Sequence, residues 1–352
     1  MPNRRRRFSF SLATLASARD SSAFSHSLVT HHLSLVTVFE MPELPEVETV
    51  LRGLRARVLG RRVAAVEVRN PLAIHGGPDE FVASVAGRRI EAFVRKGKAL
   101  AIELGPRNRK AGSEDAACRF LLVRLGMTGQ LVVVPSDTAL QPHTHVRLVL
   151  EDGREEIRFR DTRRFGRLRC CTRDELEGIL GRLGPDAPQI SEKQFLDAMR
   201  RRRGSIKGWL LNQQVLSGLG NIYADEALFE ARIHPLAQPG RLSAEAARRL
   251  HRAVKKILKR AVELQGTSFR DYIDIEGRPG NFSPRLRVYQ RTGEPCRRCG
   301  RTIRRVVVSG RSSHFCPNCQ RPPRHAASPS PKKTHRPVPP LGKQVQTRVP
   351  AA

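Results

Sequence analysis

The chain has 352 residues, which is room for about two domains and terminal extensions, so its composition excludes a single small core. Lysine and arginine total 64 against 33 acidic residues, and residues 41–320 alone still carry 52 basic and 31 acidic side chains. Such an excess of positive charge is typical of polyanion binders, so nucleic acid is the first candidate partner and an anionic membrane surface the second. No run approaches the roughly 18 apolar residues of a membrane span, which indicates a soluble protein.

The first forty residues differ in composition from the rest of the chain. Residues 1–40 combine an arginine run, Arg4–Arg7, with many serines and few acidic residues. This composition is typical of a transit peptide, of a basic leader without regular structure, or of upstream sequence translated in error. We expect residues 1–40 to be a mis-assigned start or a removable leader, because the chemistry of the next segment leaves no place for them.

The segment Met41–Glu46, with the sequence MPELPE, places a proline nitrogen beside a carboxylate. If Met41 is an initiator that is removed, Pro42 carries a free secondary amine that condenses with an aldehyde to a cationic iminium. Inside a chain the same nitrogen is an inert amide. The segment therefore predicts a nucleophile with a neighbouring acid, Glu43. The simpler interpretation is a helix start, which prolines and early carboxylates favour.

The pattern after this segment predicts an α+β fold. Apolar residues at helical spacing predict a helix after Val47 that ends at Gly60. Runs with strand composition, separated by turn residues, then predict an antiparallel β-sandwich. The expected strands are 63–69, 89–95, 99–104, 119–125, 130–134, 146–151, 155–160 and 167–171. The polar stretch 105–116 is expected to be a long hairpin loop.

Helices follow the strands, and Pro185–Pro188 is expected to close the first domain. The expected helices are 192–202, 205–213, 222–231 and 243–264. A helical second domain therefore follows a β first domain. Residues 321–352 contain many prolines and no acidic residue, which predicts a tail without regular structure and with weak nonspecific attraction to DNA.

Four of the seven cysteines form a regular pattern. Cys296, Cys299, Cys316 and Cys319 make two C-x-x-C pairs separated by sixteen residues, and the odd cysteine total argues against a disulfide framework. This spacing predicts a structural four-cysteine zinc site in a reducing compartment, with rubredoxin-like iron as the alternative. Four thiolates complete the coordination shell, so the metal would hold a small hairpin together and perform no hydrolysis.

Several turns carry side chains that suit contact with DNA. Lys98 lies in a basic turn between two expected strands, where a solvated lysine is the simpler interpretation. Met127, between two glycines, is either a core residue or an apolar wedge that enters a base stack. Arg163 and Phe165 share a tight turn that suits phosphate contact and stacking, or an edge-strand ion pair.

A glycine-rich turn at Gly218–Glu226 joins two expected helices. We expect Asn221 to cap the second helix and the exposed N–H groups at its start to hold a phosphate, although a plain helical hairpin is the alternative. Five arginines surround the cysteine pairs, and Arg311 is expected in the loop between them. The cationic hairpin indicates DNA more than a protein partner.

Taken in order, these motifs resemble those of bacterial formamidopyrimidine-DNA glycosylase. The resemblance rests on MPELPEVET, the Lys98 turn, LGMTG, D-x-RRFG, GLGNIYADE and the four-cysteine pattern, and it covers about residues 41–320. Endonuclease VIII, an oxidised-pyrimidine glycosylase, is the nearest alternative, but it typically has Gly-Pro where this chain has Leu44-Pro45. A noncatalytic zinc-containing DNA-binding protein is the alternative of another class.

The resemblance implies a bifunctional DNA glycosylase and AP lyase of base-excision repair. Such an enzyme excises 8-oxoguanine and formamidopyrimidines from damaged double-stranded DNA and then nicks the strand by β,δ-elimination. It implies Pro42 as the nucleophile that forms the Schiff base and Glu43 as the proton donor to the opening sugar ring. Lys98 would assist β-elimination and contact a phosphate, and Arg311 would serve δ-elimination.

The resemblance also implies the DNA-binding residues. Met127, Arg163 and Phe165 would fill the space left by the everted base, with Arg163 facing the orphaned cytosine, and residues 266–272 would form the loop that closes over that base. The remaining DNA contacts would be made by His143, Arg202, Lys207 and Asn221. In two places the chain departs from the family, since Arg124 stands where a histidine is expected and the hairpin loop at 105–118 is longer than usual.

The composition of the chain and the resemblance together predict an arrangement in five parts and a cellular setting. A leader at 1–40 would precede a catalytic β-sandwich domain at 41–185 and a helical domain with a helix–two-turn–helix at 190–285. A zinc finger at 286–320 and the tail at 321–352 would follow. The protein would bind one structural Zn²⁺, act as a monomer, and reside in the bacterial cytoplasm at the nucleoid.

Overall fold

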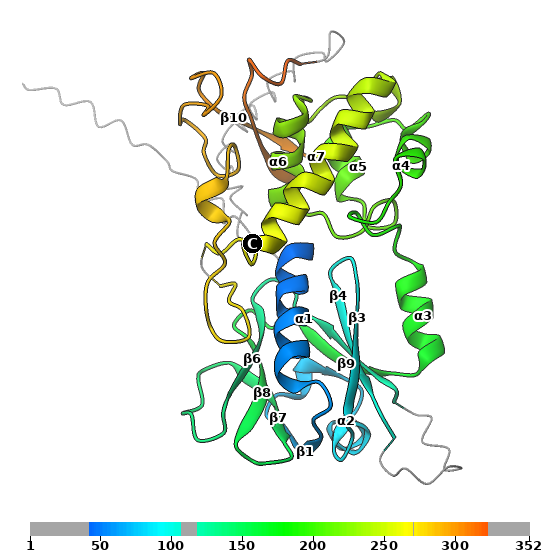
Figure 1. Ribbon diagram of the computed structural model, residues 1–352, viewed down its shortest axis with the longest axis vertical. Helices are drawn as coiled ribbons and strands as arrows, with labels where there is room; N and C mark the ends of the chain where they lie inside the picture. Colours follow the sequence, from blue (N-terminus) through cyan, green and yellow to red (C-terminus); the bar gives the residue numbers. More distant parts are fainter. Residues whose placement is uncertain (1–41, 107–117, 270, 323–352) are drawn as a thin grey trace, which may run out of the picture. The chain divides into compact units, whose positions relative to one another are not determined.

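The computed structural model of the protein describes residues 42–106, 118–269 and 271–322 (Figure 1). The expected leader at 1–40, most of the expected hairpin loop and nearly all of the expected tail lie outside the described residues. In the described part of the chain, no helix is long and apolar enough to cross a membrane.

The described residues form helices and strands in an α+β arrangement. The helices are α1 (Leu44–Val58), α2 (Pro78–Val85), α3 (Arg173–Gly181), α4 (Glu192–Met199), α5 (Ile206–Leu211), α6 (Asn221–Ala231) and α7 (Ala244–Glu263). The strands are β1 (Val63–Val68), β2 (Ile74–His75), β3 (Ile90–Lys96), β4 (Ala99–Leu104), β5 (Phe120–Arg124), β6 (Gly129–Pro135), β7 (Thr144–Leu150), β8 (Glu155–Asp161), β9 (Arg167–Cys171), β10 (Arg304–Val308) and β11 (Arg311–Phe315). Short 3₁₀ turns are η1 (Pro71–Ala73), η2 (Pro239–Arg241) and η3 (Ser283–Arg285).

The first nine strands make two sheets, which confirms the expected sandwich. One sheet has the order β1-β7-β8-β6 and is antiparallel, and the other has the order β2-β9-β5-β4-β3, with only β2 and β9 parallel. All eight strands expected from the sequence are present. The sequence did not predict β2, α2 or α3.

One hydrophobic core joins both sheets to α1. Leu54 and Val58 on α1 are fully buried in the same cluster as Leu121 of one sheet and Ile157 of the other. Burying each such side chain stabilises the fold by about 2 kcal/mol, so we expect Leu54→Ala, which leaves a cavity, to cost about 2–5 kcal/mol. This packing fixes the position of the start of α1, which Pro42 and Glu43 immediately precede.

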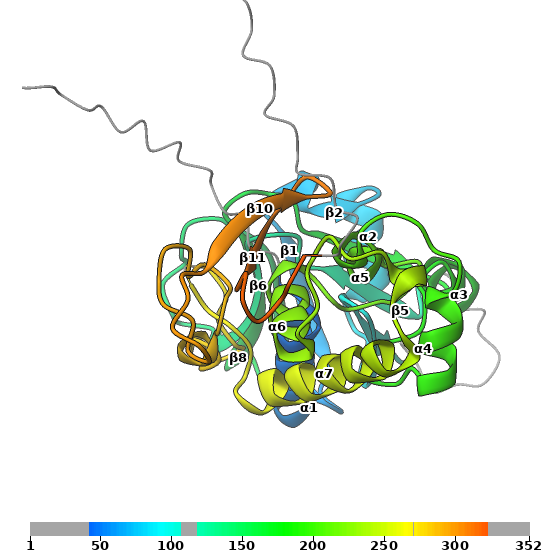
Figure 2. The same ribbon diagram turned by 90° about the horizontal axis from the view of Figure 1, so that it is seen from above.

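A second core lies among α4, α5, α6 and α7. Leu250, Val254 and Leu258 on one face of α7 pack with Tyr223 and Leu228 of α6. Figure 2 shows the β10–β11 hairpin beside α6, the helix that also begins at the glycine-rich turn. The helix α6 therefore has buried contacts with the helical core along its length and with the cysteine-bearing hairpin.

Candidate active site

The carboxylate of Glu43, just before α1, lies at the start of α6. It accepts backbone N–H groups from Gly220 at 2.7 Å and from Ile222 at 2.9 Å, with Tyr223 more distant at 3.5 Å. Burial raises the pKa of Glu43, and this effect outweighs the opposing effects of Lys98 and of the three N–H groups. The acid form of Glu43 therefore persists to higher pH than that of a solvated glutamate.

This arrangement corrects two expectations about the glycine-rich turn. The N-cap of α6 is Gly220, and Asn221 is the first residue of the helix, so Asn221 does not cap it. The N–H groups expected to hold a phosphate are bonded to Glu43 instead. The carboxylate occupies the positive end of the helix that an external anion would otherwise occupy. The Oδ1 atom of Asn221 is buried without a hydrogen-bond partner in the structure.

Lys98, in the β3–β4 turn, meets Glu43 at Gly220. A Cβ atom added to Gly220 would lie 2.3 Å from Oε1 of Glu43 and 2.6 Å from Nζ of Lys98, so only glycine leaves room for both charged groups. Loss of water around the ammonium lowers the pKa of Lys98; Glu43 opposes this effect and Arg311 adds to it. A larger fraction of Lys98 is therefore neutral than for a solvated lysine, as a proton acceptor requires.

A carboxylate clamp holds the Lys98 turn. Asp186 accepts the backbone N–H of Gly97 at 2.7 Å and two hydrogen bonds from the guanidinium of Arg95 at 3.0 and 2.7 Å. Arg95 also donates to Glu48 of α1 at 2.7 Å. The sequence indicated residues 185–188 only as the end of the first domain. It gave no sign that Asp186 holds the Lys98 turn.

Pro42 lines a cavity of about 20 Å³, the size of a single water molecule. The other lining residues come from four segments of the chain, namely Glu46, Met127, Ile222, Thr267, Asp271 and Tyr272. The structure thus brings the expected nucleophile beside the expected wedge residue. It also places residues of the 266–272 loop at the same cavity, although Arg270 of this loop lies outside the described residues.

Glu46 is a second buried acid beside Glu43. It accepts the backbone N–H of Glu43 at 2.8 Å, the backbone N–H of Thr267 at 2.7 Å and the hydroxyl of Tyr223. Burial, and then the nearby charge of Glu43, raise the pKa of Glu46 to about 7. The sequence indicated Glu46 only as a residue that favours a helix start, and it indicated Tyr223 and Thr267 only as members of the glycine-rich turn motif and of the 266–272 loop.

Two turns that carry expected DNA-binding residues lie side by side. The backbone N–H of Arg163 donates to the hydroxyl of Thr128 at 3.0 Å, which joins the 161–166 turn to the Met127 turn. A Cβ on Gly126, whose φ is +66°, would lie 2.7 Å from the backbone nitrogen of Gly166, so the close approach requires glycine. Met127 and the 161–166 turn are therefore neighbours.

Phe165 and His143 belong to the same surface. The Phe165 side chain is 56% exposed, and the guanidinium of Arg163 lies 5.1 Å from the centre of its ring. The carbonyl of the exposed His143 accepts the backbone N–H of Asp161 at 3.1 Å. An exposed phenylalanine beside an arginine is suited to stacking on a base.

The remaining expected DNA contacts have different surroundings. Lys207 is fully buried, and its ammonium lies 2.6 Å from Asp225 and donates to the carbonyl of Ser312 at 2.6 Å. It links α5, α6 and β11 and presents nothing to solvent, so its expected direct contact with DNA does not fit this conformation. Arg202 is exposed in the loop after α4, and Arg124, which replaces the expected histidine, is exposed at the end of β5.

The four cysteines meet at the β10–β11 hairpin. The sulfur atoms of Cys296, Cys299, Cys316 and Cys319 all lie within 4.8 Å of one another, and Cys299 is 3.5 Å from both Cys316 and Cys319. A tetrahedral Zn²⁺ with Zn–S bonds of about 2.3 Å needs sulfur atoms about 3.8 Å apart, so the cluster fits a structural zinc ion.

Two consecutive carboxylates of α6 hold the zinc region. Asp225 accepts the backbone N–H of His314 at 2.8 Å and the hydroxyl of Ser313 at 3.1 Å. Glu226 accepts the backbone N–H groups of residues 287–289 at 2.9–3.0 Å. This docking places Arg311, the first residue of β11, close enough to lower the pKa of Lys98. The sequence indicated Asp225 and Glu226 only as part of a motif, and not as residues that hold the zinc region.

Comparison with known families finds three matches in chain order. Residues 41–168 match the formamidopyrimidine-DNA glycosylase N-terminal domain, and residues 182–272 match the formamidopyrimidine-DNA glycosylase H2TH domain. Residues 293–322 match a domain described as the zinc finger found in FPG and IleRS. The third match assigns the four-cysteine cluster to a zinc finger, so the protein's metal is one structural zinc ion.

Similar proteins match over nearly their whole length. A formamidopyrimidine-DNA glycosylase of Solibacter usitatus is 45% identical over 283 residues, which are 80% of this chain and all of that relative. The crystal structure of the Lactococcus lactis protein with Fapy-dG-containing DNA has a TM-score of 0.73 at 32% identity. The match covers 80% of this chain and all of the Lactococcus lactis chain. The structure of the Thermus thermophilus protein has a TM-score of 0.68 at 41% identity. The match covers 79% of this chain and 98% of the Thermus thermophilus chain.

Proposed function

Because the chain belongs to the formamidopyrimidine-DNA glycosylase family, we propose that its reactive form begins at Pro42 and attacks damaged nucleotides through the secondary amine of that residue. The protein is a DNA glycosylase of base-excision repair that removes oxidised purines from DNA, and membership of the family implies an AP lyase step. The single observation that carries the proposal is the cavity in which Pro42 lies beside Glu46 and Met127, with Glu43 next in the chain.

The first stage is displacement of the damaged base. The nitrogen of Pro42 attacks C1′ of the deoxyribose, the bond from C1′ to the base breaks, and the base leaves with the bonding electrons and takes up the proton that the attacking amine loses. Glu43 then gives its proton to the ring oxygen, and the sugar opens to an iminium joined to Pro42. The raised pKa of Glu43 supports this role, because the acid must be protonated before it can donate.

The second stage breaks the strand. The iminium acidifies C2′, and Lys98, whose pKa is lowered, accepts the C2′ proton as the 3′ phosphate leaves. A second elimination, assisted by Arg311, releases the 5′ phosphate, and water then hydrolyses the Schiff base to free the enzyme. The charge of Arg311 acts on Lys98, which supports a role for Arg311 in the same site. The zinc ion takes no part in these bonds, because four thiolates complete its coordination shell.

We also propose how the enzyme holds DNA while the base is everted. Met127, Arg163 and Phe165 fill the space in the stack, and His143, Arg202 and Asn221 contact the backbone. Support comes from the adjacent Met127 and 161–166 turns and from the exposure of Phe165. Lys207 acts instead as a positioning residue, through the carbonyl of Ser312 next to Arg311.

We further infer that residues 41–185, 190–285 and 286–320 serve as catalytic, helical DNA-binding and zinc-finger domains. The three family matches support this division, with boundaries close to those proposed. All of the proposed catalytic groups come from one chain, which supports a monomer. The bacterial origin of the relatives supports the bacterial cytoplasm, with the nucleoid as the site of action.

Borohydride trapping tests the proposed nucleophile. Protein that starts at Pro42 should form a covalent adduct when borohydride is present during incubation with an 8-oxoguanine duplex, because borohydride reduces the iminium to a stable amine. A Pro42→Gly form with the same start should trap far less, and protein that starts at Met1 should form no adduct through Pro42. Peptide mapping locates the attached residue. The absence of any adduct from the Pro42 form would refute the mechanism.

A further inference from the structure

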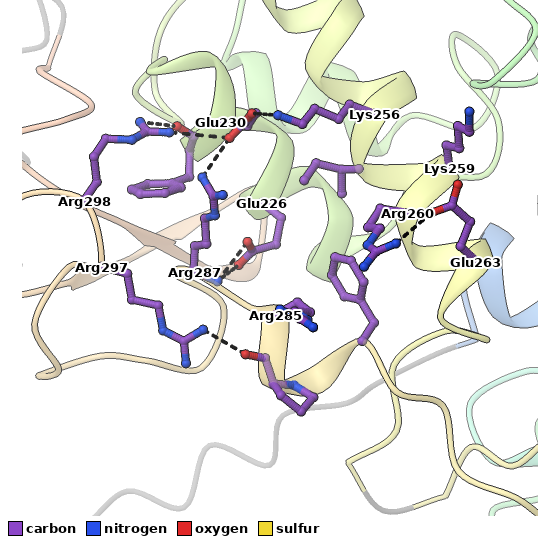
Figure 3. A pocket seen from close by; sticks show the side chains of 14 residues that line it. Glu226, Glu230, Lys256, Lys259, Arg260, Glu263, Arg285, Arg287, Arg297 and Arg298 are labelled. Carbon is purple, nitrogen blue, oxygen red and sulfur yellow. Dashed lines mark hydrogen bonds and ion pairs between the residues drawn. The ribbon is translucent and has the colours of Figure 1, made fainter.

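A second, larger cleft lies away from the catalytic cavity. It has a volume of about 720 Å³ and is lined by the C-terminal parts of α6 and α7 and by residues 282–298 (Figure 3). None of its lining residues lines the cavity at Pro42. Because α6 rises about 1.5 Å per residue, Glu230 in this cleft lies about 13 Å along the helix from Asn221. The cleft is therefore at the opposite end of α6 from Glu43.

The cleft carries excess positive charge. Seven lysines and arginines line it against three glutamates. One of the glutamates, Glu230, already binds three of these cations, with Lys256 at 2.6 Å, Arg287 at 3.0 Å and Arg298 at 3.5 Å. The backbone N–H groups of residues 287–289 bind another, Glu226. The cleft thus already binds carboxylates both through side-chain cations and through backbone donors.

Three cations of the cleft remain without a carboxylate in the described part of the chain. Lys259 and Arg285 are exposed and form no ion pair there, and Arg297 donates only to the backbone carbonyl of Pro284 at 2.8 Å. Figure 3 shows these three side chains around the cleft, with no dashed line from any of them to a carboxylate. Their charge is available to an external anion.

Apolar groups also line the cleft. Ile257 on α7 is half-buried, and Pro284 on the facing segment is exposed, so both present apolar surface within the cleft. The ring of Phe282 contributes to the lining but is only 2% exposed. A ligand that fits the cleft therefore needs both an apolar group and several anionic groups.

We propose that this cleft binds an acidic peptide segment of a partner protein, with carboxylates paired to Lys259, Arg285 and Arg297 and an apolar side chain packed between Ile257 and Pro284. The phosphate backbone of DNA supplies the charge but offers no apolar group to these walls. An acidic peptide with an apolar residue supplies both, and it repeats the carboxylate contacts that Glu230 already makes. Since the cleft is separate from the Pro42 cavity, the enzyme can hold this partner and damaged DNA together.

Fluorescence anisotropy with the zinc-loaded protein tests this proposal directly. The probe is a fluorescein-labelled hexapeptide, Glu-Asp-Leu-Phe-Asp-Glu, in low salt. We expect the double variant Lys259→Glu/Arg285→Glu to weaken binding at least about tenfold, because two attractive contacts become repulsive. The matched control is Arg89→Glu/Arg154→Glu, which changes the net charge equally at exposed sites of the β-sandwich and should change affinity less than about twofold.

Two further measurements complete the test. A peptide with Ala-Ala in place of Leu-Phe should bind at least about threefold more weakly, as an apolar contact requires. Excision of 8-oxoguanine from a short duplex should be unchanged in Lys259→Glu/Arg285→Glu, which shows that this variant folds. If the variant folds poorly, Lys259→Ala/Arg285→Ala should still weaken peptide binding about threefold.

Three outcomes would overturn the proposal. Equal weakening by the cleft variant and by the control would indicate attraction to net charge alone. Equal affinity for the Ala-Ala peptide would remove the apolar contact. Tighter binding of a labelled hexamer of thymidine, lost in the cleft variant, would assign the cleft to nucleic acid.

Discussion

The carboxylate of Glu43 accepts the backbone N–H of Gly220 at 2.7 Å, although 177 residues separate the two in the chain. This contact joins the residue after the proposed nucleophile to the first turn of α6. It gives the proposed acid a fixed position and, through burial, a raised pKa. The catalytic geometry therefore depends on Gly220, a residue without a side chain.

Replacement of Gly220 by alanine should disable catalysis. The added Cβ would lie 2.3 Å from Glu43 and 2.6 Å from Lys98, so both groups must move. A shift of about 1 Å typically costs about 100-fold in rate, and we expect a loss of this size in single-turnover excision. The control is Gly178→Ala in α3, where no atom lies within 4 Å and helix propensity should add up to about 1 kcal/mol of stability. A normal rate for Gly220→Ala would contradict the geometry.

Asp186→Ala should separate strand cleavage from base removal. The change frees the backbone N–H of Gly97 and the guanidinium of Arg95, which loosens the turn that carries Lys98. We expect β-elimination to slow about tenfold more than base excision, because only the former uses Lys98. Gel analysis with and without alkaline cleavage measures the two steps on the same duplex. Asp197→Ala, at an exposed ion pair, is the control and should affect neither step. Equal slowing of both steps would argue against a role through Lys98.

Glu46 should make stability fall as the pH rises. Its pKa is about 7 in the folded protein and about 4.5 when unfolded, so between these values the folded state binds more protons than the unfolded state. Its favourable contribution is fully present below pH 4.5 and is lost as the pH rises to 7, by as much as about 3 kcal/mol. Urea denaturation at pH 5 and pH 8 measures the free energy of unfolding. This free energy should decrease less between the two pH values for Glu46→Gln than for the unchanged protein. An equal decrease in the free energy of unfolding for both proteins would show that Glu46 does not titrate in this range.

Asp225→Asn should destabilise the zinc region. The variant leaves the buried ammonium of Lys207 without a counter-charge, which typically costs about 3–5 kcal/mol. Asp225→Leu combined with Lys207→Met removes both charges and should recover part of this loss. Urea denaturation measures the free energy of unfolding, and a cost below about 1 kcal/mol for Asp225→Asn would show that the pair is not important for stability.

Removal of zinc should weaken DNA binding. A strong chelator leaves four thiolates without the ion that holds them, so the β10–β11 hairpin and Arg311 lose their positions. We expect affinity for an abasic-site duplex to fall at least tenfold and to return when zinc is added back. Retained affinity after complete zinc loss, measured by metal analysis, would contradict a structural role.

The sequence by itself determined the parts of this protein. The eight strands, the five helices α1 and α4–α7 and the zinc cysteines were predicted correctly, because turn residues, periodicity and C-x-x-C spacing act over a few neighbouring residues. The order of the motifs was sufficient to indicate the family.

Only the tertiary structure decided what several residues do. It assigned the N–H groups of the glycine-rich turn to Glu43 and buried Lys207 against Asp225. It also showed that Asp186 holds the turn that carries Lys98. Each of these contacts joins residues far apart in the chain. They depend on how α1, α6 and the sheets pack against one another. The segments that come together at a site determine how deeply its side chains are buried and which hydrogen-bond donors are near them.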